Sequence, residues 1–228
     1  MPKAIKWVKD RLGVTPCLQP YVATQVSFQD LDRWGLQLSS DPAFFAECEA
    51  DLTLLSAEDR VRLDRVKTNF SHLLRHPPVL EDAVKLTVLA HLLDLADFYT
   101  EPVDLRTEHS IEVEIETEDP PNNVRVRGSI DVLVLANRFW IVVIESKRAE
   151  LALDVGRPQV LSYMLGSPSG DRPCYGLLTN GSNFRFLKLQ KTPQPIYGMS
   201  RIFDLYSPGQ ELYGVLAILK HLKTLALS

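Results

Sequence analysis

Two apolar runs of the sequence, residues 129–135 and 139–145, carry charged side chains where their neighbours would be buried. Both runs are rich in Val, Ile, Leu and aromatic residues, a composition typical of β-strands. The polar connection between them, Ala136-Asn137-Arg138, has a length common in hairpins. The sequence therefore predicts a β-hairpin that bears charges, and a buried charge is costly unless it is paired or binds a metal ion.

This hairpin is expected to bring three charged side chains together. If the turn centres on Arg138, Asp131 and Glu145 face one another across the two strands. Cross-strand Cβ atoms are roughly 4.5–5.5 Å apart, and two carboxylates that close repel each other unless a positive group lies between them. Period-2 alternation places Lys147 on the same strand face as Glu145. We therefore expect two acids and one ammonium group to converge.

Two carboxylates beside a lysine suit the hydrolysis of a phosphodiester. Mg²⁺ prefers oxygen ligands, usually takes one or two carboxylates, and leaves its other positions to water and substrate phosphate. A metal ion held there can polarise the phosphodiester and lower the pKa of a bound water. A neighbouring lysine can orient or deprotonate the attacking water. The expected cofactor is Mg²⁺, with Mn²⁺ able to substitute, and the expected substrate is a nucleic-acid backbone.

Three short motifs resemble the successive motifs of the PD-(D/E)xK nuclease superfamily: Gly128-Ser-Ile-Asp131, Glu145-Ser-Lys147 and Gln159-Val-Leu-Ser-Tyr163. The Gln-x-x-x-Tyr element is similar to that of RecB-like nucleases and of the N-terminal nuclease domain of type I restriction motor subunits. The resemblance covers roughly residues 80–189. It implies a restriction-endonuclease-like α/β fold, in which helices flank a mixed central sheet.

The resemblance also implies roles for individual residues. Asp131 and Glu145 would bind the metal, and Lys147 would act at the attacking water. Gln159 and Tyr163 would support the site from a helix. A helix that starts near residue 157, with proline in its first turn, puts these two residues one turn apart on one face.

Members of the superfamily usually carry a further acid on a helix before the first strand. Residues 79–99 show apolar spacing typical of a helix, and Glu81 lies in its first turn. Glu81 is therefore the candidate third metal ligand. Asp82, Asp94 and Asp97 on the same helix compete with it, and a charge that only stabilises its helix is a further interpretation.

The sequence departs from the family pattern at one motif position, and it lacks a motor motif. Ile130 stands where the superfamily name specifies Pro, and no Gly-x-x-x-x-Gly-Lys-[Ser/Thr] occurs, so an ATP-driven motor would be a separate chain. The formal net charge of −4 at pH 7 predicts weak, salt-sensitive binding to DNA. A separate motor or specificity subunit, or a homodimer that cuts symmetrically, would assist.

The predicted organisation is a helical N-terminal layer or subdomain, residues 1–76, followed by a nuclease-like domain, residues 77–228. Within the first part, helices are expected at residues 2–12, from Asp41-Pro42 to about residue 54, and from a Ser56-x-x-Asp59 capping signal to about residue 75. Residues 13–24 are expected to be irregular or extended. The second part is predicted to run helix–strand–strand–strand–helix–strand–strand, with residues 118–123 as a turn and residues 209–225 as a closing helix.

Cysteine usage and hydropathy predict the compartment. Cys17, Cys48 and Cys174 are scattered and suggest reduced thiols. Residues 1–12 lack the apolar stretch of a secretory signal, and no run approaches the length of a membrane span. We expect a cytoplasmic protein that does not enter membranes.

The sequence as a whole predicts a Mg²⁺-dependent deoxyribonuclease, endonucleolytic and suited to restriction or repair. One alternative is a catalytically inactive nuclease-fold module that binds nucleic acid or a partner protein. Another is a nucleotide phosphohydrolase that uses the same acids on a small substrate. The sequence leaves open DNA against RNA, single against double strands, and sequence specificity.

Overall fold

The computed structural model describes residues 20–49, 51–116, 123–136, 139–168 and 170–228. The helix predicted at residues 2–12, most of the irregular segment predicted at 13–24, and nearly all of the turn predicted at 118–123 lie outside the described residues.

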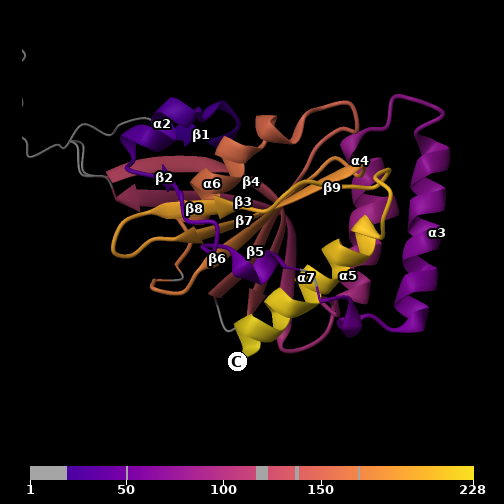
Figure 1. Ribbon diagram of the computed structural model, residues 1–228. Coiled ribbons are helices and arrows are strands. Elements are labelled where there is room, and N and C mark those ends of the chain that lie inside the picture. Colours follow the sequence, from indigo (N-terminus) through magenta and orange to yellow (C-terminus); the bar gives the residue numbers. More distant parts are fainter. Residues whose placement is uncertain (1–19, 50, 117–122, 137–138, 169) are drawn as a thin grey trace, which may run out of the picture.

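A nine-stranded mixed sheet forms the centre of the described structure (Figure 1). Its order is β1-β4-β5-β6-β7-β8-β2, with β3 beside β4 and β9 beside β7. The pairs β1–β4, β5–β6 and β2–β8 are parallel, and the others are antiparallel. The strands are β1 (Tyr21–Val22), β2 (Gln37–Leu38), β3 (Val103–Glu116), β4 (Asn123–Ala136), β5 (Phe139–Ser146), β6 (Cys174–Thr179), β7 (Asn183–Gln190), β8 (Ile196–Met199) and β9 (Phe203–Asp204).

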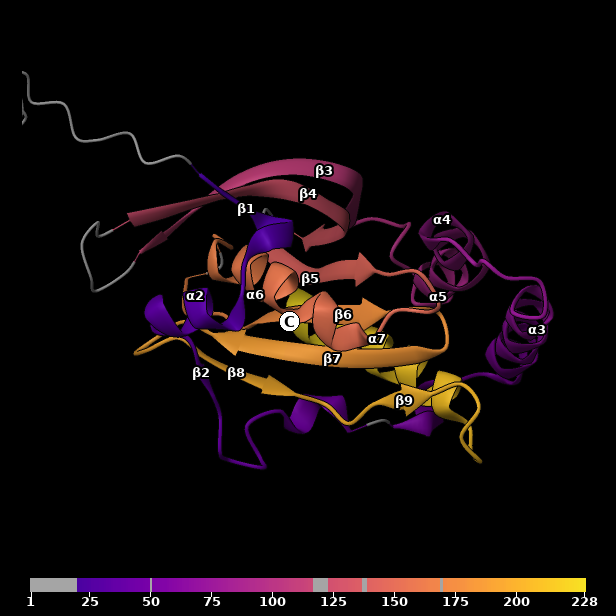
Figure 2. The same ribbon diagram turned by 90° about the horizontal axis from the view of Figure 1, so that it is seen from above.

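Helices cover both faces of the sheet, as Figures 1 and 2 show. The helical elements are η1 (Ala23–Gln25), α2 (Phe28–Arg33), η2 (Ala46–Cys48), η3 (Leu52–Leu54), α3 (Ala57–Leu73), α4 (Glu81–Val84), η4 (Lys85–Leu89), α5 (Ala90–Leu95), η5 (Leu153–Val155), α6 (Arg157–Leu165) and α7 (Glu211–Leu227). One apolar core joins α2 and α6 to the sheet, and the other joins α3, α5 and α7 to its opposite face. The mixed central sheet with flanking helices confirms the predicted α/β class, whereas the restriction-endonuclease-like fold stays a prediction. None of the helices that the structure describes combines the length and the apolar character needed to cross a membrane.

The order of elements from α4 to β7 matches the predicted one. The connection from β5 through α6 to the parallel strand β6 is a crossover of the kind that parallel neighbours require. The closing helix α7 spans Glu211–Leu227, close to the predicted residues 209–225. The carboxyl end of β5, where this crossover begins, is packed on both faces of the sheet, because its neighbouring residues Val143 and Ile144 lie in opposite cores.

The helix predicted at residues 79–99 is present over residues 81–95, as α4, η4 and α5 in succession. The middle element, η4, is a π-helical turn and begins at Lys85. Asp97 adopts a left-handed φ of 57°, and the helix ends before it. A π turn inside an α-helix accommodates one extra residue and re-aims the side chains on its two sides.

The capping prediction at Ser56 is confirmed, because Ser56 and Asp59 form a reciprocal capping box at the start of α3. The helix predicted from Asp41 to about residue 54 is wrong, since two separate 3₁₀ turns, η2 and η3, occupy that range. The side chain of Asp51 accepts the backbone N–H and the hydroxyl of Thr53 and starts a new turn, a local bond that competes with a continuous helix.

Sequence reasoning missed α2, although Ser27 and Asp30 form the same capping box and supply the signal. The predicted N-terminal layer, described from residue 20, therefore contains strands as well as helices. Strands β1 and β2 of this part pair with β4 and β8. Its residues Phe45, Leu63 and Phe70 share a core with α7. The division at residue 76 stays a prediction.

Candidate active site

The β4–β5 hairpin contains a one-residue irregularity close to its turn. Leu135 pairs with Trp140, whereas the preceding residue of β4, Val134, pairs with Val142. Ile141 is thus an extra residue of β5, which is the definition of a β-bulge. Ile141 packs in the same core as Val142, although neighbouring residues of a regular strand point to opposite faces.

The bulge decides which residue faces Asp131. Beyond it Val132 pairs with Ile144, and the same register continued by one residue sets Asp131 opposite Glu145. Without the extra residue Asp131 would face Ile144, and Glu145 would point away from it. The register agrees with the predicted pairing, but a connection of residues 137–138 plus a bulge produces it. Those two residues lie outside the described part.

Asp131 is held from the end of β5. One of its oxygens, Oδ2, accepts the backbone N–H of Ser146 at 2.7 Å and the Ser146 hydroxyl at 2.9 Å. Both residues are buried. Sequence reasoning passed over Ser146, although it is the middle residue of the Glu145-Ser-Lys147 motif. Its role is to fix the Asp131 carboxylate so that only Oδ1 faces the rest of the site.

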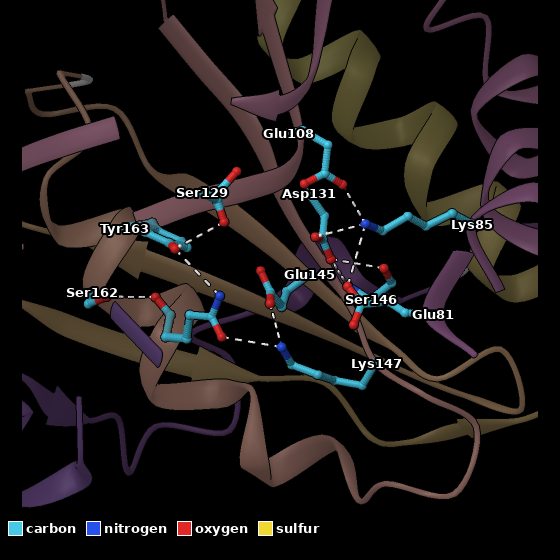
Figure 3. A network of polar contacts seen from close by, with 11 residues as sticks. Glu81, Lys85, Glu108, Ser129, Asp131, Glu145, Ser146, Lys147, Ser162 and Tyr163 are labelled. Carbon is cyan, nitrogen blue, oxygen red and sulfur yellow. Dashed lines mark hydrogen bonds and ion pairs between the residues drawn. The ribbon is translucent and has the colours of Figure 1, made fainter. Parts of the chain in front are cut away.

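Glu145, near the end of β5, pairs with Lys147, which directly follows the strand (Figure 3). The Lys147 ammonium donates to Glu145 Oε1 at 2.5 Å. The other oxygen, Glu145 Oε2, is buried and has no hydrogen-bond partner. Burial, together with the negative charge of Asp131, raises the pKa of Glu145 to about 8. A buried carboxylate oxygen without a donor is costly, so this geometry favours a cation beside it.

Two residues of helix α6, Gln159 and Tyr163, hold Lys147 in place. Gln159 accepts a hydrogen bond from Lys147 at 3.2 Å through Oε1 and donates to the Tyr163 hydroxyl at 3.4 Å through Nε2. Tyr163 in turn donates to the backbone carbonyl of Ser129 at 3.1 Å. Both helix residues are buried, one turn apart on one face, as predicted. The chain of contacts links the lysine to β4 through two fixed side chains.

Gly128 explains how Tyr163 comes so close to β4. A Cβ atom at position 128 would lie 2.2 Å from the Tyr163 hydroxyl oxygen and 2.8 Å from the Cβ of Ala23. Tyr163 has no exposed surface and cannot move aside easily. The first residue of the Gly128-Ser-Ile-Asp131 motif must therefore be small for α6 to seat on the sheet.

A second lysine enters the site from the helix before β3. Lys85 Nζ lies 3.1 Å from Asp131 Oδ1, 2.6 Å from Glu108 and 3.4 Å from Glu81 (Figure 3). Although burial alone would lower it, the pKa of Lys85 is raised, because Glu108 and Asp131 stabilise the charged form. Lys85 thus joins three carboxylates that come from three different elements.

Among the helix acids, Glu81 is the one that shares Lys85 with Asp131. Its pKa is raised by burial and by the charge of Asp131. The competing Asp94 pairs with Arg62 instead. Sequence reasoning missed Lys85, for which its position four residues after Glu81 is the signal. It also missed Glu108, which has a left-handed φ of 47° and which no sequence pattern singles out.

The carboxylates of the site offer the kind of ligand that a divalent cation requires. Oxygen ligands from carboxylates are those that Mg²⁺ prefers, and the unpartnered Glu145 Oε2 fits this need. When ionised, the four carboxylates and two ammonium groups leave two negative charges, which one divalent ion would balance. As the side chains lie, no three His, Cys, Asp or Glu residues of the described ranges are grouped to hold an ion. Lys85 lies between the acids instead (Figure 3).

No protein-family model matches this chain, and a search of the curated proteins also finds no match. The resemblance to the nuclease superfamily therefore rests on the three motifs and on the way their residues lie together.

Proposed function

We propose that the protein is a metal-dependent nuclease that hydrolyses phosphodiester bonds of DNA, with a fold of the restriction-endonuclease type. The observation that carries this proposal is the buried, unpartnered oxygen of Glu145 opposite Asp131, with Lys147 paired to its other oxygen. Structural ion pairs normally satisfy their buried oxygens. A carboxylate left open beside a second acid is more typical of a ligand site than of a stabilising pair.

Asp131 and Glu145 would hold the ion, with Glu81 as the third acid. Bound Mg²⁺ or Mn²⁺ would supply charge stabilisation at the phosphoryl group and a water of lowered pKa. Asp131 presents a single oriented oxygen, because Ser146 occupies the other. Preorganised donors and acceptors of this kind contribute most when they need not rearrange during the reaction.

Lys147 would act on the attacking water. Its ammonium group is held between Glu145 and Gln159, so two contacts fix where its remaining donor points. Gln159 and Tyr163 are positioning residues in this proposal, since they reach the site only through Lys147 and the backbone of β4. Rigid support of this sort keeps a reacting group within catalytic distance.

DNA is proposed as the substrate because the motifs resemble those of DNA nucleases. The net charge of −4 gives the chain little general attraction for a polyanion. We therefore propose that a second copy or a separate motor or specificity subunit helps to place the DNA.

The test is cleavage of supercoiled plasmid with Mg²⁺ or Mn²⁺, comparing wild type with Lys147→Ala and Asp131→Asn. Both variants should lose nicking by a factor of about 100 or more, the usual contribution of one acid–base group. The matched controls Lys223→Ala and Asp171→Asn change the same residue types at positions that do not contact the site residues, and they should cleave as wild type does. Equal cleavage by all five proteins would show a contaminant and remove support from the site.

A second candidate is an inactive module of the same fold that binds nucleic acid or a partner protein. The observation in its favour is that each of the three proposed ligands already contacts a lysine. Calorimetric titration with Mg²⁺ separates the two functions. A nuclease must bind the ion through Asp131, whereas absence of binding in wild type would favour the inactive module.

A further inference from the structure

The oxygens of Asp131 and Glu145 are occupied unequally. Ser146 takes Asp131 Oδ2 with two donors, and Lys85 takes Oδ1. Lys147 takes Glu145 Oε1 and leaves Oε2 open. An ion that binds both acids can therefore use Glu145 without moving Lys147. It can reach Asp131 only at Oδ1, where the ammonium group of Lys85 lies.

We infer that Lys85 is a tethered cation that occupies the carboxylate cluster when no metal is bound, and that a divalent ion binding at Asp131 displaces its ammonium group. This inference rests on the proposed function, because it requires a metal site at these acids. It assigns different behaviour to the two lysines: Lys85 leaves its place at Asp131, whereas Lys147 keeps its contact with Glu145.

The position of Lys85 suits this exchange. Its ammonium contacts Asp131 and Glu81, two of the three proposed ligands, so it neutralises the charges that an ion would meet. Two like charges cannot share one carboxylate oxygen at contact distance without strong repulsion. The displaced group has a place to go, because Glu108 is largely exposed and already lies 2.6 Å from Lys85.

Lys147, unlike Lys85, does not occupy an oxygen that the ion has to use. Lys147 is shared between Glu145 and a neutral amide, Gln159, and neither contact covers the open oxygen. Lys147 also follows directly on β5, where its backbone N–H donates to the carbonyl of Thr179 at 2.8 Å. It therefore serves as the internal control for Lys85 in one and the same protein.

The first test measures amine reactivity in the wild-type protein. Brief labelling with acetic anhydride is compared in EDTA and in Ca²⁺, a probe ion with the same preference for oxygen ligands, and the peptides are quantified by mass spectrometry. Labelling of Lys85 should rise several-fold with Ca²⁺, while Lys147 should not gain reactivity. Half-buried Lys223, which contacts the Asp97 carbonyl and none of the site residues, normalises the two samples. Unchanged or reduced labelling of Lys85 in a sample that binds Ca²⁺ would overturn the inference.

The second test compares the Ca²⁺ affinities of Lys85→Gln and Lys147→Gln by calorimetry. Each variant removes one positive charge from the cluster, but only Lys85→Gln vacates Asp131 Oδ1, the one oxygen of Asp131 that the ion can use. Lys147→Gln vacates Glu145 Oε1, whereas the ion already has the open Glu145 Oε2. We expect Lys85→Gln to bind Ca²⁺ roughly tenfold more tightly than Lys147→Gln does, a factor equal to about 1.4 kcal/mol. Lys85→Arg keeps the charge and should stay near wild type. Equal affinities for the two Gln variants would contradict displacement.

The outcomes separate this inference from the proposed function. Ca²⁺ binding without any change at Lys85 overturns the inference but does not contradict the proposed nuclease function. Displacement of Lys85 in a protein that does not cleave DNA supports the inference and contradicts the proposed nuclease function. No binding of Ca²⁺ or Mg²⁺ to wild type or to Lys85→Gln overturns both.

Discussion

Glu145 combines near-complete burial with an oxygen that contacts no donor, and it faces a second acid. These features raise the pKa of its carboxyl group to about 8, burial first and the charge of Asp131 second. In an unfolded chain a glutamic acid titrates at about 4.3. The folded protein therefore holds this proton more tightly than the unfolded chain does.

This difference sets the sign of a pH effect on stability. Because the folded pKa is the higher one, ionisation of Glu145 lowers the free energy of unfolding as the pH rises from about 4.5 to about 8. The change is on the order of a few kcal/mol, at about 1.4 kcal/mol for each pKa unit. In EDTA, Glu145→Gln should match wild type near pH 4 and become more stable than wild type towards pH 8. Urea denaturation at several pH values measures the difference.

Two features make this measurement specific. Taking the difference between variant and wild type cancels the titration of groups that do not interact with Glu145. Glu112→Gln, at an exposed position where the carboxylate lies 3.8 Å from Arg125, serves as the matched control and should show a flat difference. A pH-independent difference for Glu145→Gln would mean that the pKa of this carboxyl group is the same in the folded protein and in the unfolded chain.

At the scale of elements, two inserted residues orient the site. The bulge at Ile141 brings Glu145 opposite Asp131, and the π turn that begins at Lys85 lies between the two α-helical segments of residues 81–95. Irregularities of both kinds are over-represented at functional sites. A third element, α6, is fixed to β4 by the close approach of Tyr163 to Gly128.

This approach predicts coupling between β4 and α6. Gly128→Ala should lower the free energy of unfolding by about 1–3 kcal/mol, since the new methyl group overlaps the Tyr163 hydroxyl. In a Tyr163→Phe background the hydroxyl is absent, and the same substitution should cost about 1 kcal/mol less. Urea denaturation of the four proteins of this double-mutant cycle gives the interaction energy.

The cycle contains its own control, because Tyr163→Phe alone reports the loss of the bonds to Ser129 and Gln159. Some cost of Gly128→Ala should remain in the Phe background, since Ala23 stays 2.8 Å from the added Cβ. Strict additivity of the two substitutions would show that the hydroxyl does not limit the approach of helix and strand.

At the scale of the molecule, the N-terminal part is built into both cores. Trp34, at the end of α2, packs with α6, and Phe70 of α3 packs with α7 and the sheet. A Cβ atom at Gly181 would lie 2.2 Å from the Phe70 ring, so α3 approaches the β6–β7 turn closely. These contacts argue that residues 20–76 and 77–228 unfold together.

We therefore predict one cooperative unfolding transition. Variants that keep only Trp34 or only Trp140 as fluorescent reporters should have the same midpoint in urea. Phe70→Ala removes a fully buried ring and should cost about 3–5 kcal/mol. It should move both midpoints equally. A shift confined to Trp34 would instead support a separate subdomain at residues 1–76.

The exposed Val61 gives the matched control on the same helix. It is 70% exposed, so Val61→Ala removes apolar surface that is not in either core. With either reporter, the free energy of unfolding of this variant should lie within a few tenths of a kcal/mol of the wild-type value.

Local patterns in the sequence determined the elements and the grouping of the main site residues. Runs rich in Val, Ile, Leu and aromatic residues specified β4 and β5, Pro158 and the spacing of Gln159 and Tyr163 specified α6, and Ser56 with Asp59 specified the start of α3. These features depend on neighbours a few residues apart, which a sequence displays directly. The same reasoning failed after Asp41, where side chains bond to their own backbone and break the helix.

Only the tertiary structure decided how the charges are paired. The bulge at Ile141 depends on packing against the sheet, and the meeting of Lys85 with Asp131 and Glu108 joins residues far apart in the chain. Long-range contacts of this kind leave no local periodicity, because each depends on the twist and spacing of several elements together. The sequence by itself placed two acids and a lysine at one strand end, and the packed fold determined that a second lysine lies among them.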